Sequence, residues 1–155
     1  MHKLFIFIFL SLCLGACSLG HNDYSDFSNK PAQGWGYNDT ISFTPSFADS
    51  IATGNLSIAV RHDNSYPFRN LWVEVTINMD SIVTSRDSIN IEFADIYGNW
   101  HGKGIGSTLQ IEKGISEGIT LPDSANIHIR HIMRVDTLQG IEQIGIFFFS
   151  DKQQD

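Results

Sequence analysis

The chain has 155 residues, and its 10 Lys and Arg against 17 Asp and Glu give a formal net charge of −7 at pH 7. This length suits one domain with its own hydrophobic core. The acidic balance argues against nucleic acid as a partner and against electrostatic attachment to anionic lipids. Both cysteines, Cys13 and Cys17, lie near the N-terminus. The sequence therefore predicts a domain that folds without a disulfide.

The N-terminus has the pattern of a lipoprotein signal peptide. An apolar segment over residues 4–14 follows a short basic start, and it is well short of the roughly 20 residues that a membrane-spanning helix needs. Gly15 and Ala16 are small residues directly before Cys17, as in a lipobox. We predict that residues 1–16 are cleaved and that Cys17 carries acyl chains such as palmitate, which form a stable anchor. An ordinary secretory signal that happens to contain a cysteine is the alternative.

Residues 17–36 are rich in Ser, Asn, Asp and Gly and show no hydrophobic period. We predict that they form a lipidated flexible tether, which lets the following domain stand clear of the bilayer. The folded domain is then expected over residues 37–155, with no break that would divide it in two.

Within that domain the hydrophobic period is two, as in half-buried β-strands. Turn-forming clusters rich in Asp, Asn, Gly and Pro separate the alternating segments. No window shows a helical stripe, so we predict an all-β fold. It is an antiparallel β-sandwich of about seven or eight strands, of jelly-roll or immunoglobulin-like type. The residues expected to point into the core are Leu56, Ile58, Val60, Leu71, Val73, Val75, Ile77, Ile89, Ile91, Phe93, Leu109, Ile111, Ile127 and Ile129.

Four histidines lie in the expected domain without the spacing of metal ligands: His62, His101, His128 and His131. His128 and His131 are three residues apart, which places them on opposite faces of a strand. We therefore predict surface or turn histidines and no metal site. The glycines around Trp100 favour a hairpin and a bulge over a phosphate loop, because no helix is expected to follow them. No nucleophile-elbow motif is present, and no residue is singled out as catalytic.

Loop aromatics offer a possible binding site. Tyr66, Phe68, Trp72 and Trp100 fall at or beside expected loops, where a jelly roll often stacks sugar rings. The alternative, which we favour, is that Trp72 and Trp100 cap the two ends of the core.

Three blocks of sequence are more particular than a generic strand and loop: "RHDNSYPFRNLW", "GNWHGKGIG" and "MRVDTLQGIEQIGI". Together, and in this order, they resemble the gliding-motility lipoprotein family GldH of the Bacteroidota, over roughly residues 35–149. The resemblance implies an outer-membrane-associated lipoprotein of the gliding and type IX secretion apparatus, with envelope protein partners, no enzymatic activity and no cofactor. It does not imply that the host glides. The positions that carry it are Arg61, Tyr66, Pro67, Asn70, Trp72, Trp100, Met133 and Arg134.

These positions are expected to be structural rather than contact-making. Arg61 and Arg134 would need partners, and Asp63 and Asp136 are within loop reach. For localisation, Ser18 stands where an aspartate would favour the inner membrane, so we expect the outer membrane. The acidic cluster that sends lipoproteins of this phylum to the cell surface is poorly matched, which favours the periplasmic leaflet.

Six of the 12 aspartates are followed by Ser or Thr and then an apolar residue. Turn chemistry explains part of this excess, because Asp, Ser and Thr satisfy backbone groups at turns. The triplet also resembles the periplasmic O-glycosylation acceptor of the same phylum. We expect a glycan on at least one of the six, with Ser50, Ser81 and Ser124 favoured because their surroundings read as loops. The candidate hydroxyls are those of Thr40, Ser50, Ser81, Ser88, Ser124 and Thr137.

Overall fold

The computed structural model describes residues 22–29 and 33–151, and the predicted signal peptide and Cys17 lie outside these ranges. The described residues form β-strands and no helix, and so contain no helical segment suited to crossing a membrane. The strands are β1 (Tyr24–Asn29), β2 (Trp35–Gly36), β3 (Ile41–Phe43), β4 (Ile51–His62), β5 (Asn70–Met79), β6 (Ile82–Glu92), β7 (Lys103–Ile105), β8 (Thr108–Pro122), β9 (Asn126–His131), β10 (Thr137–Leu138) and β11 (Ile141–Ser150).

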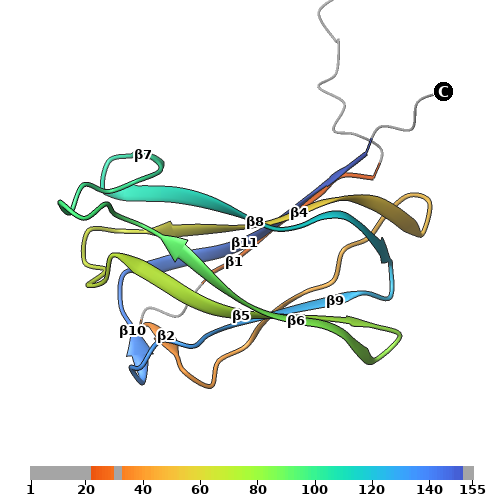
Figure 1. Ribbon diagram of the computed structural model, residues 1–155, viewed down its shortest axis with the longest axis horizontal. Helices are drawn as coiled ribbons and strands as arrows, with labels where there is room; N and C mark the ends of the chain where they lie inside the picture. The colour runs from red at the N-terminus through yellow and green to blue at the C-terminus, as the bar shows by residue number, and fades with distance from the viewer. Residues whose placement is uncertain (1–21, 30–32, 152–155) are drawn as a thin grey trace, which may run out of the picture.

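Two facing antiparallel sheets form the sandwich (Figure 1). One sheet has the strand order β1-β11-β4-β8-β7, and the other has the order β3-β9-β5-β6. Without the short β7, each sheet has four strands, and chain-order neighbours lie mostly in opposite sheets. This interleaving is the topology of a jelly roll, which decides between the two predicted types. The all-β sandwich prediction is confirmed, and the short β2, β7 and β10 are additions to its eight strands.

The core lies between the two sheets and follows the predicted alternation. Leu56, Ile58 and Val60 on β4 face Val73 and its neighbours on β5, and all are at most 2% exposed. Because the period of a strand is two, the intervening residues point outward. Leu109 and Ile111 are only partly buried, since β8 lies near the side where the sandwich opens.

The predicted tether over residues 17–36 is wrong from Tyr24 onward. Tyr24 to Asn29 form β1, which pairs along its whole length with β11. Trp35 is completely buried, and its indole N–H donates to the carbonyl oxygen of Asp39 at 2.9 Å. Polar composition concealed this strand, because β1 is an edge strand that buries little apolar surface of its own. The folded domain therefore begins near residue 22 rather than at 37.

The hairpin between β5 and β6 turns on two residues, since Met79 pairs with Ile82. Asp80 and Ser81 both have positive φ, at 49° and 67°. A two-residue hairpin turn of this kind matches the right-handed twist of the strands but strains residues other than glycine.

Two of the four histidines are not at the surface, contrary to the sequence-based expectation. His62 and His131 are both 0% exposed. His128 lies on the opposite face of β9 from His131, as predicted, and its Nδ1 shares a 2.7 Å hydrogen bond with the hydroxyl of Ser42. The inward positions were visible in the alternation of β4 and β9, where each buried histidine follows the apolar residues of the inner face.

Candidate functional site

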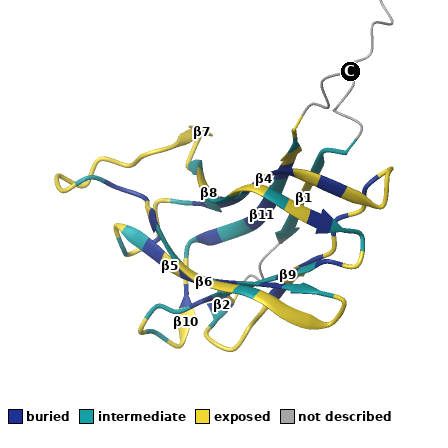
Figure 2. Ribbon diagram, turned by 45° about the vertical axis from the view of Figure 1, so that its right-hand side comes forward, coloured by how far each residue is buried: buried dark blue, intermediate teal, exposed yellow. Residues whose placement is uncertain are grey.

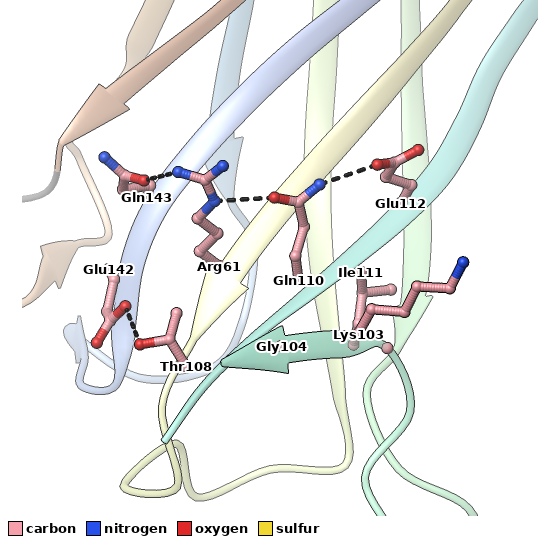
Figure 3. Close-up of a pocket in the computed structure, with 10 residues that line it drawn as sticks. Arg61, Lys103, Gly104, Thr108, Gln110, Ile111, Glu112, Glu142 and Gln143 are labelled. Atoms are coloured by element: carbon pink, nitrogen blue, oxygen red, sulfur yellow. Dashed lines mark hydrogen bonds between the residues drawn. The ribbon is translucent and has the colours of Figure 1, made fainter. Parts of the chain in front are cut away.

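A pocket with a volume of about 860 Å³ opens on the outer face of the larger sheet. Three neighbouring strands, β11, β4 and β8, form its floor, and the β7 hairpin forms one wall (Figure 3). Arg61 on β4 stands at the centre of the floor, where its cross-strand neighbours are Gln143 and Gln110.

The floor is a continuous row of hydrogen bonds. Arg61 Nε donates to Gln110 Oε1 at 2.8 Å, and Arg61 Nη1 donates to Gln143 Oε1. Gln110 Nε2 in turn donates to Glu112 Oε1 at 2.9 Å. Register creates the two bonds of Arg61, because residues opposite one another on adjacent strands bring their side chains within reach. Gln110 and Glu112 are two residues apart on β8 and so lie on the same face. Figure 3 shows the three bonds as one line across the strands.

An aromatic ring holds the Arg61 side chain from the β1 side. The guanidinium carbon of Arg61 lies 4.0 Å from the ring centroid of Phe27, a favourable cation–π geometry. Phe27 also meets Phe147 edge to face, with 5.4 Å between centroids. Gly145 makes this possible, because a Cβ there would lie 2.5 Å from the Phe27 ring.

The predicted ion pair between Arg61 and Asp63 is wrong. Asp63 instead accepts hydrogen bonds from the backbone N–H and the hydroxyl of Ser65. In the described part of the chain, Arg130 and Glu74 form an ion pair, and both lie on the other sheet. Amide oxygens and an aromatic face therefore hold the Arg61 guanidinium, and no carboxylate of the described part of the chain forms an ion pair with it within 4 Å.

The glycines of the pocket wall have a packing role. A Cβ on Gly104 would lie 2.0 Å from the carbonyl oxygen of Thr108, and one on Gly102 would lie 2.5 Å from that of Gln110. Only glycine lets β7 run this close to β8. The predicted hairpin is confirmed: Ile105 pairs with Thr108 around a turn in which Gly106 has φ of 69°.

The pocket lining also contains a positive group, that of Lys103, and a negative one, that of Glu142. Lys103 lies in its wall, and the Thr108 hydroxyl donates to Glu142 Oε2 at 3.0 Å. The planar amide, guanidinium and carboxylate groups thus hold one another in fixed orientations. Such an array of oriented donors and acceptors suits recognition of a polar ligand. No group of three or more potential metal ligands occurs in residues 22–29 and 33–151.

Several family-like positions close the end of the sandwich beside this pocket. Tyr66 is buried and donates its hydroxyl to the carbonyl oxygen of Asn70 at 2.9 Å, and burial raises its pKa. The Asn70 side chain donates to Asn90 Oδ1. These bonds tie the loop between β4 and β5 to the end of β6.

His62 lies at the same closed end of the sandwich. Its ring stacks on Phe93 with 4.4 Å between centroids and 13° between planes, and the ring of Trp100 lies 5.0 Å away. Trp100, which is 36% exposed, therefore covers one end of the core. Burial lowers the pKa of His62, against smaller opposing effects from Asp63 and Glu142.

The other family-like positions lie elsewhere. Trp72 points out from β5 and is 41% exposed, while its backbone N–H lies 3.3 Å from the Met133 sulfur. Pro67 and Arg134 are exposed. The structure thus does not bring the proposed sugar-stacking aromatics together, because Tyr66 is buried and Trp72 stands on the outer face of the other sheet.

All six candidate glycosylation hydroxyls belong to exposed residues. Ser50, Ser81 and Ser124 lie in turns at one end of the sandwich. The Asp123 N–H donates to the Ser50 carbonyl oxygen, and the Ser124 hydroxyl donates to Asp80 Oδ1 at 2.7 Å. Thr40 precedes β3, and Ser88 and Thr137 lie in β6 and β10.

Sequence reasoning found Arg61 but missed the residues that surround it. Gln110, Gln143 and Phe27 stand far from Arg61 in the chain, and only strand order and register bring them together. Alternation did mark Gln110 as an outward residue between two apolar neighbours, but it carried no information on which strand lies beside it.

Fold and pocket define a jelly-roll domain with a polar recess on the outer face of its larger sheet. The GldH lipoprotein family model matches residues 22–147, and the chain belongs to that family. The gliding motility lipoprotein GldH of Flavobacterium johnsoniae is 27% identical over 118 residues, covering 72% of this chain and 74% of that protein. The GldH homolog of Christiangramia forsetii is 22% identical over 154 residues and covers 92% of each chain. The resemblance seen in the sequence blocks is confirmed.

Among solved structures, dimeric latent PorU from Porphyromonas gingivalis aligns with a TM-score of 0.35 and 11% identity, covering 88% of this chain and 14% of that one. So low a score carries no argument about function.

Proposed function

We propose that this chain is a non-enzymatic scaffold or accessory subunit of an outer-membrane-associated assembly that serves gliding motility and type IX secretion. The observation that carries the proposal is the family match over residues 22–147, which covers nearly the whole described domain. Of the two relatives named above, one is a gliding motility lipoprotein and the other is named as its homolog. The pocket around Arg61 supports a binding role, because its polar groups hold one another rather than presenting an activated nucleophile.

A deletion in the native host tests this function. Loss of the protein should lower the amount of type IX cargo in the culture medium, and colony spreading if the host glides. The wild-type gene should restore both. Unchanged secretion and unchanged envelope composition in the deletion strain would overturn the proposal.

The proposed anchor is Cys17, on the periplasmic leaflet of the outer membrane. The Leu-Gly-Ala-Cys spacing supports it, as does membership of a lipoprotein family. A Cys17→Ala variant should lose its acyl mass and leave the membrane fraction. Retention of that mass in the variant would contradict the anchor, and protease treatment of intact cells distinguishes the two leaflets.

Glycan binding is the second candidate function, now placed at the Arg61 pocket instead of at Tyr66, Trp72 and Trp100. The specific observation in its favour is the row of amide, guanidinium and carboxylate groups, which matches the hydrogen-bonding pattern of sugar hydroxyls. A glycan array probed with wild-type protein and with Arg61→Met tests it: binding lost in the variant would support this function, and no binding by either would reject it.

We also propose that at least one of the six Asp-Ser/Thr-apolar triplets carries an O-linked glycan. Exposure of all six hydroxyl residues supports this, and turns such as that of Ser50 leave room for a bulky group. Intact-mass analysis of protein from the native host should show hexose increments above the acylated chain. Their absence would leave turn chemistry as the explanation.

A further inference from the structure

One side of the jelly roll is left open between two strand edges that face each other. Strand β6 is the last strand of its sheet, and every residue pair recorded for it is with β5. On the opposite sheet, β7 covers β8 only at Thr108–Gln110, so β8 beyond Gln110 pairs with β4 alone. Among the described residues, both edges therefore present backbone N–H and C=O groups that no strand pairs.

A groove of about 690 Å³ lies between these edges. Residues 87–92 of β6 form one side, and residues 111–115 of β8 form most of the other. Six residues of strand extend about 20 Å, which is long enough to pair with a bound strand. Figure 2 shows β6 as a largely exposed strand.

The β6 edge has few of the devices that normally prevent strand addition. Natural edges are protected by proline, by charged side chains and lysine above all, by bulges or by a covering loop. Strand β6 contains neither proline nor lysine, and its charged residues are Arg86, Asp87 and Glu92. Its register with β5 is regular from Ser85 to Glu92, since the only shift lies near the hairpin, beside Asn78.

The groove also has the side chains for a particular kind of strand. Ile89, Ile111 and Ile115 are only partly buried against the core, so they offer an apolar floor to alternate residues of an added strand. Three carboxylates, those of Asp87, Glu92 and Glu112, line the groove, and they outnumber the single ammonium, that of Lys113. Basic residues on the outward face of the added strand would complement this charge.

We propose that this groove binds an extended segment of a partner protein by β-strand addition to β6, with apolar residues alternating with Lys or Arg. Such addition takes its affinity from main-chain hydrogen bonds and its specificity from alternate side chains. A second copy of this chain is disfavoured as the occupant, because the protein is itself acidic, with a net charge of −7. The proposal rests on the binding role proposed above and names the kind of partner. A glycan on Ser88, which lines the groove, would block it.

The first test uses synthetic peptides of about nine residues and the full chain in detergent, from a host without O-glycosylation. A peptide of alternating Lys and Val should bind and should slow amide hydrogen exchange at residues 87–92. A peptide of alternating Glu and Val, and the Lys-Val peptide with alternate amides N-methylated, should both bind at least about tenfold more weakly. Equal binding of the N-methylated peptide would overturn strand addition, and protection confined to other strands would overturn the site.

Gly114→Arg is the matched blocking variant, since Gly114 lines the groove, a Cβ there has no atom within 4 Å, and the added positive charge would oppose a basic strand. This variant should bind the Lys-Val peptide with at least about tenfold lower affinity. Glu117→Lys, an exposed change on β8 outside the groove lining, should leave the affinity within about twofold. Unchanged affinity in Gly114→Arg contradicts the proposal, and so does a wild-type dimer that this variant converts to monomer. Both results leave the secretion phenotype of the deletion strain, and hence the proposed function, untouched.

Discussion

His62 shows how one residue can make the stability of the domain depend on pH. Its ring is fully buried against Phe93, and its Nε2 has no hydrogen-bond partner among the described residues. Burial disfavours the imidazolium and lowers the pKa of His62 below its usual 6.5. On falling pH the unfolded chain therefore takes up this proton earlier than the folded chain does, and stability falls below about pH 6.5. Above that pH both states are neutral at His62, and its contribution is constant.

We predict that His62→Gln flattens this dependence. Between about pH 7.5 and about pH 5.5, the free energy of unfolding of the wild type should fall by more than that of the variant. Urea denaturation at the two pH values measures the difference. His101→Gln, which removes an exposed imidazole, controls for loss of a histidine. An equal fall in the free energy of unfolding of the wild type and of His62→Gln would show that His62 is not the source of the pH dependence.

At the scale of elements, β1 is a structural strand although its composition predicted a tether. Phe27 contributes the ring on which Arg61 and Phe147 pack. We predict that Phe27→Ala lowers the free energy of unfolding by about 1–2 kcal/mol. Ser25→Ala, an exposed change on the same strand, should have an effect of less than about 0.5 kcal/mol. Urea denaturation distinguishes the cases, because a tether would make both variants neutral.

The turn between β5 and β6 stores strain in two residues other than glycine. Ser81 has a φ of 67°, which costs a side chain with a Cβ roughly 1–2 kcal/mol. We predict that Ser81→Gly raises the free energy of unfolding by about 0.5–1 kcal/mol, once the greater freedom of glycine in the unfolded chain is subtracted. Ser88→Gly, within β6, should lower it by a similar amount. Thermal denaturation of both variants tests the opposite signs, and destabilisation by Ser81→Gly would show that the turn is not strained.

For the whole molecule, sequence alone predicted the class of fold because alternation reports directly on a half-buried strand. Leu71 to Ile77 and Ile127 to Ile129 were all assigned to the correct face. Strand β1 was missed, since an edge strand with Ser, Asp and Asn carries little periodic signal. The polar pocket was missed for another reason: Arg61, Gln110 and Gln143 meet only through register between strands far apart in the chain.

The partners of the whole molecule are identified most directly by co-purification. Tagged wild-type protein should be recovered from detergent-solubilised membranes of the native host, with quantitative mass spectrometry of what accompanies it. We predict that envelope proteins of the gliding and type IX secretion apparatus accompany it in near-stoichiometric amounts. The Cys17→Ala variant should recover fewer of them because it leaves the membrane. Recovery of no stable protein partner, together with measurable binding on a glycan array, would contradict the proposal that this lipoprotein acts as a protein-binding subunit.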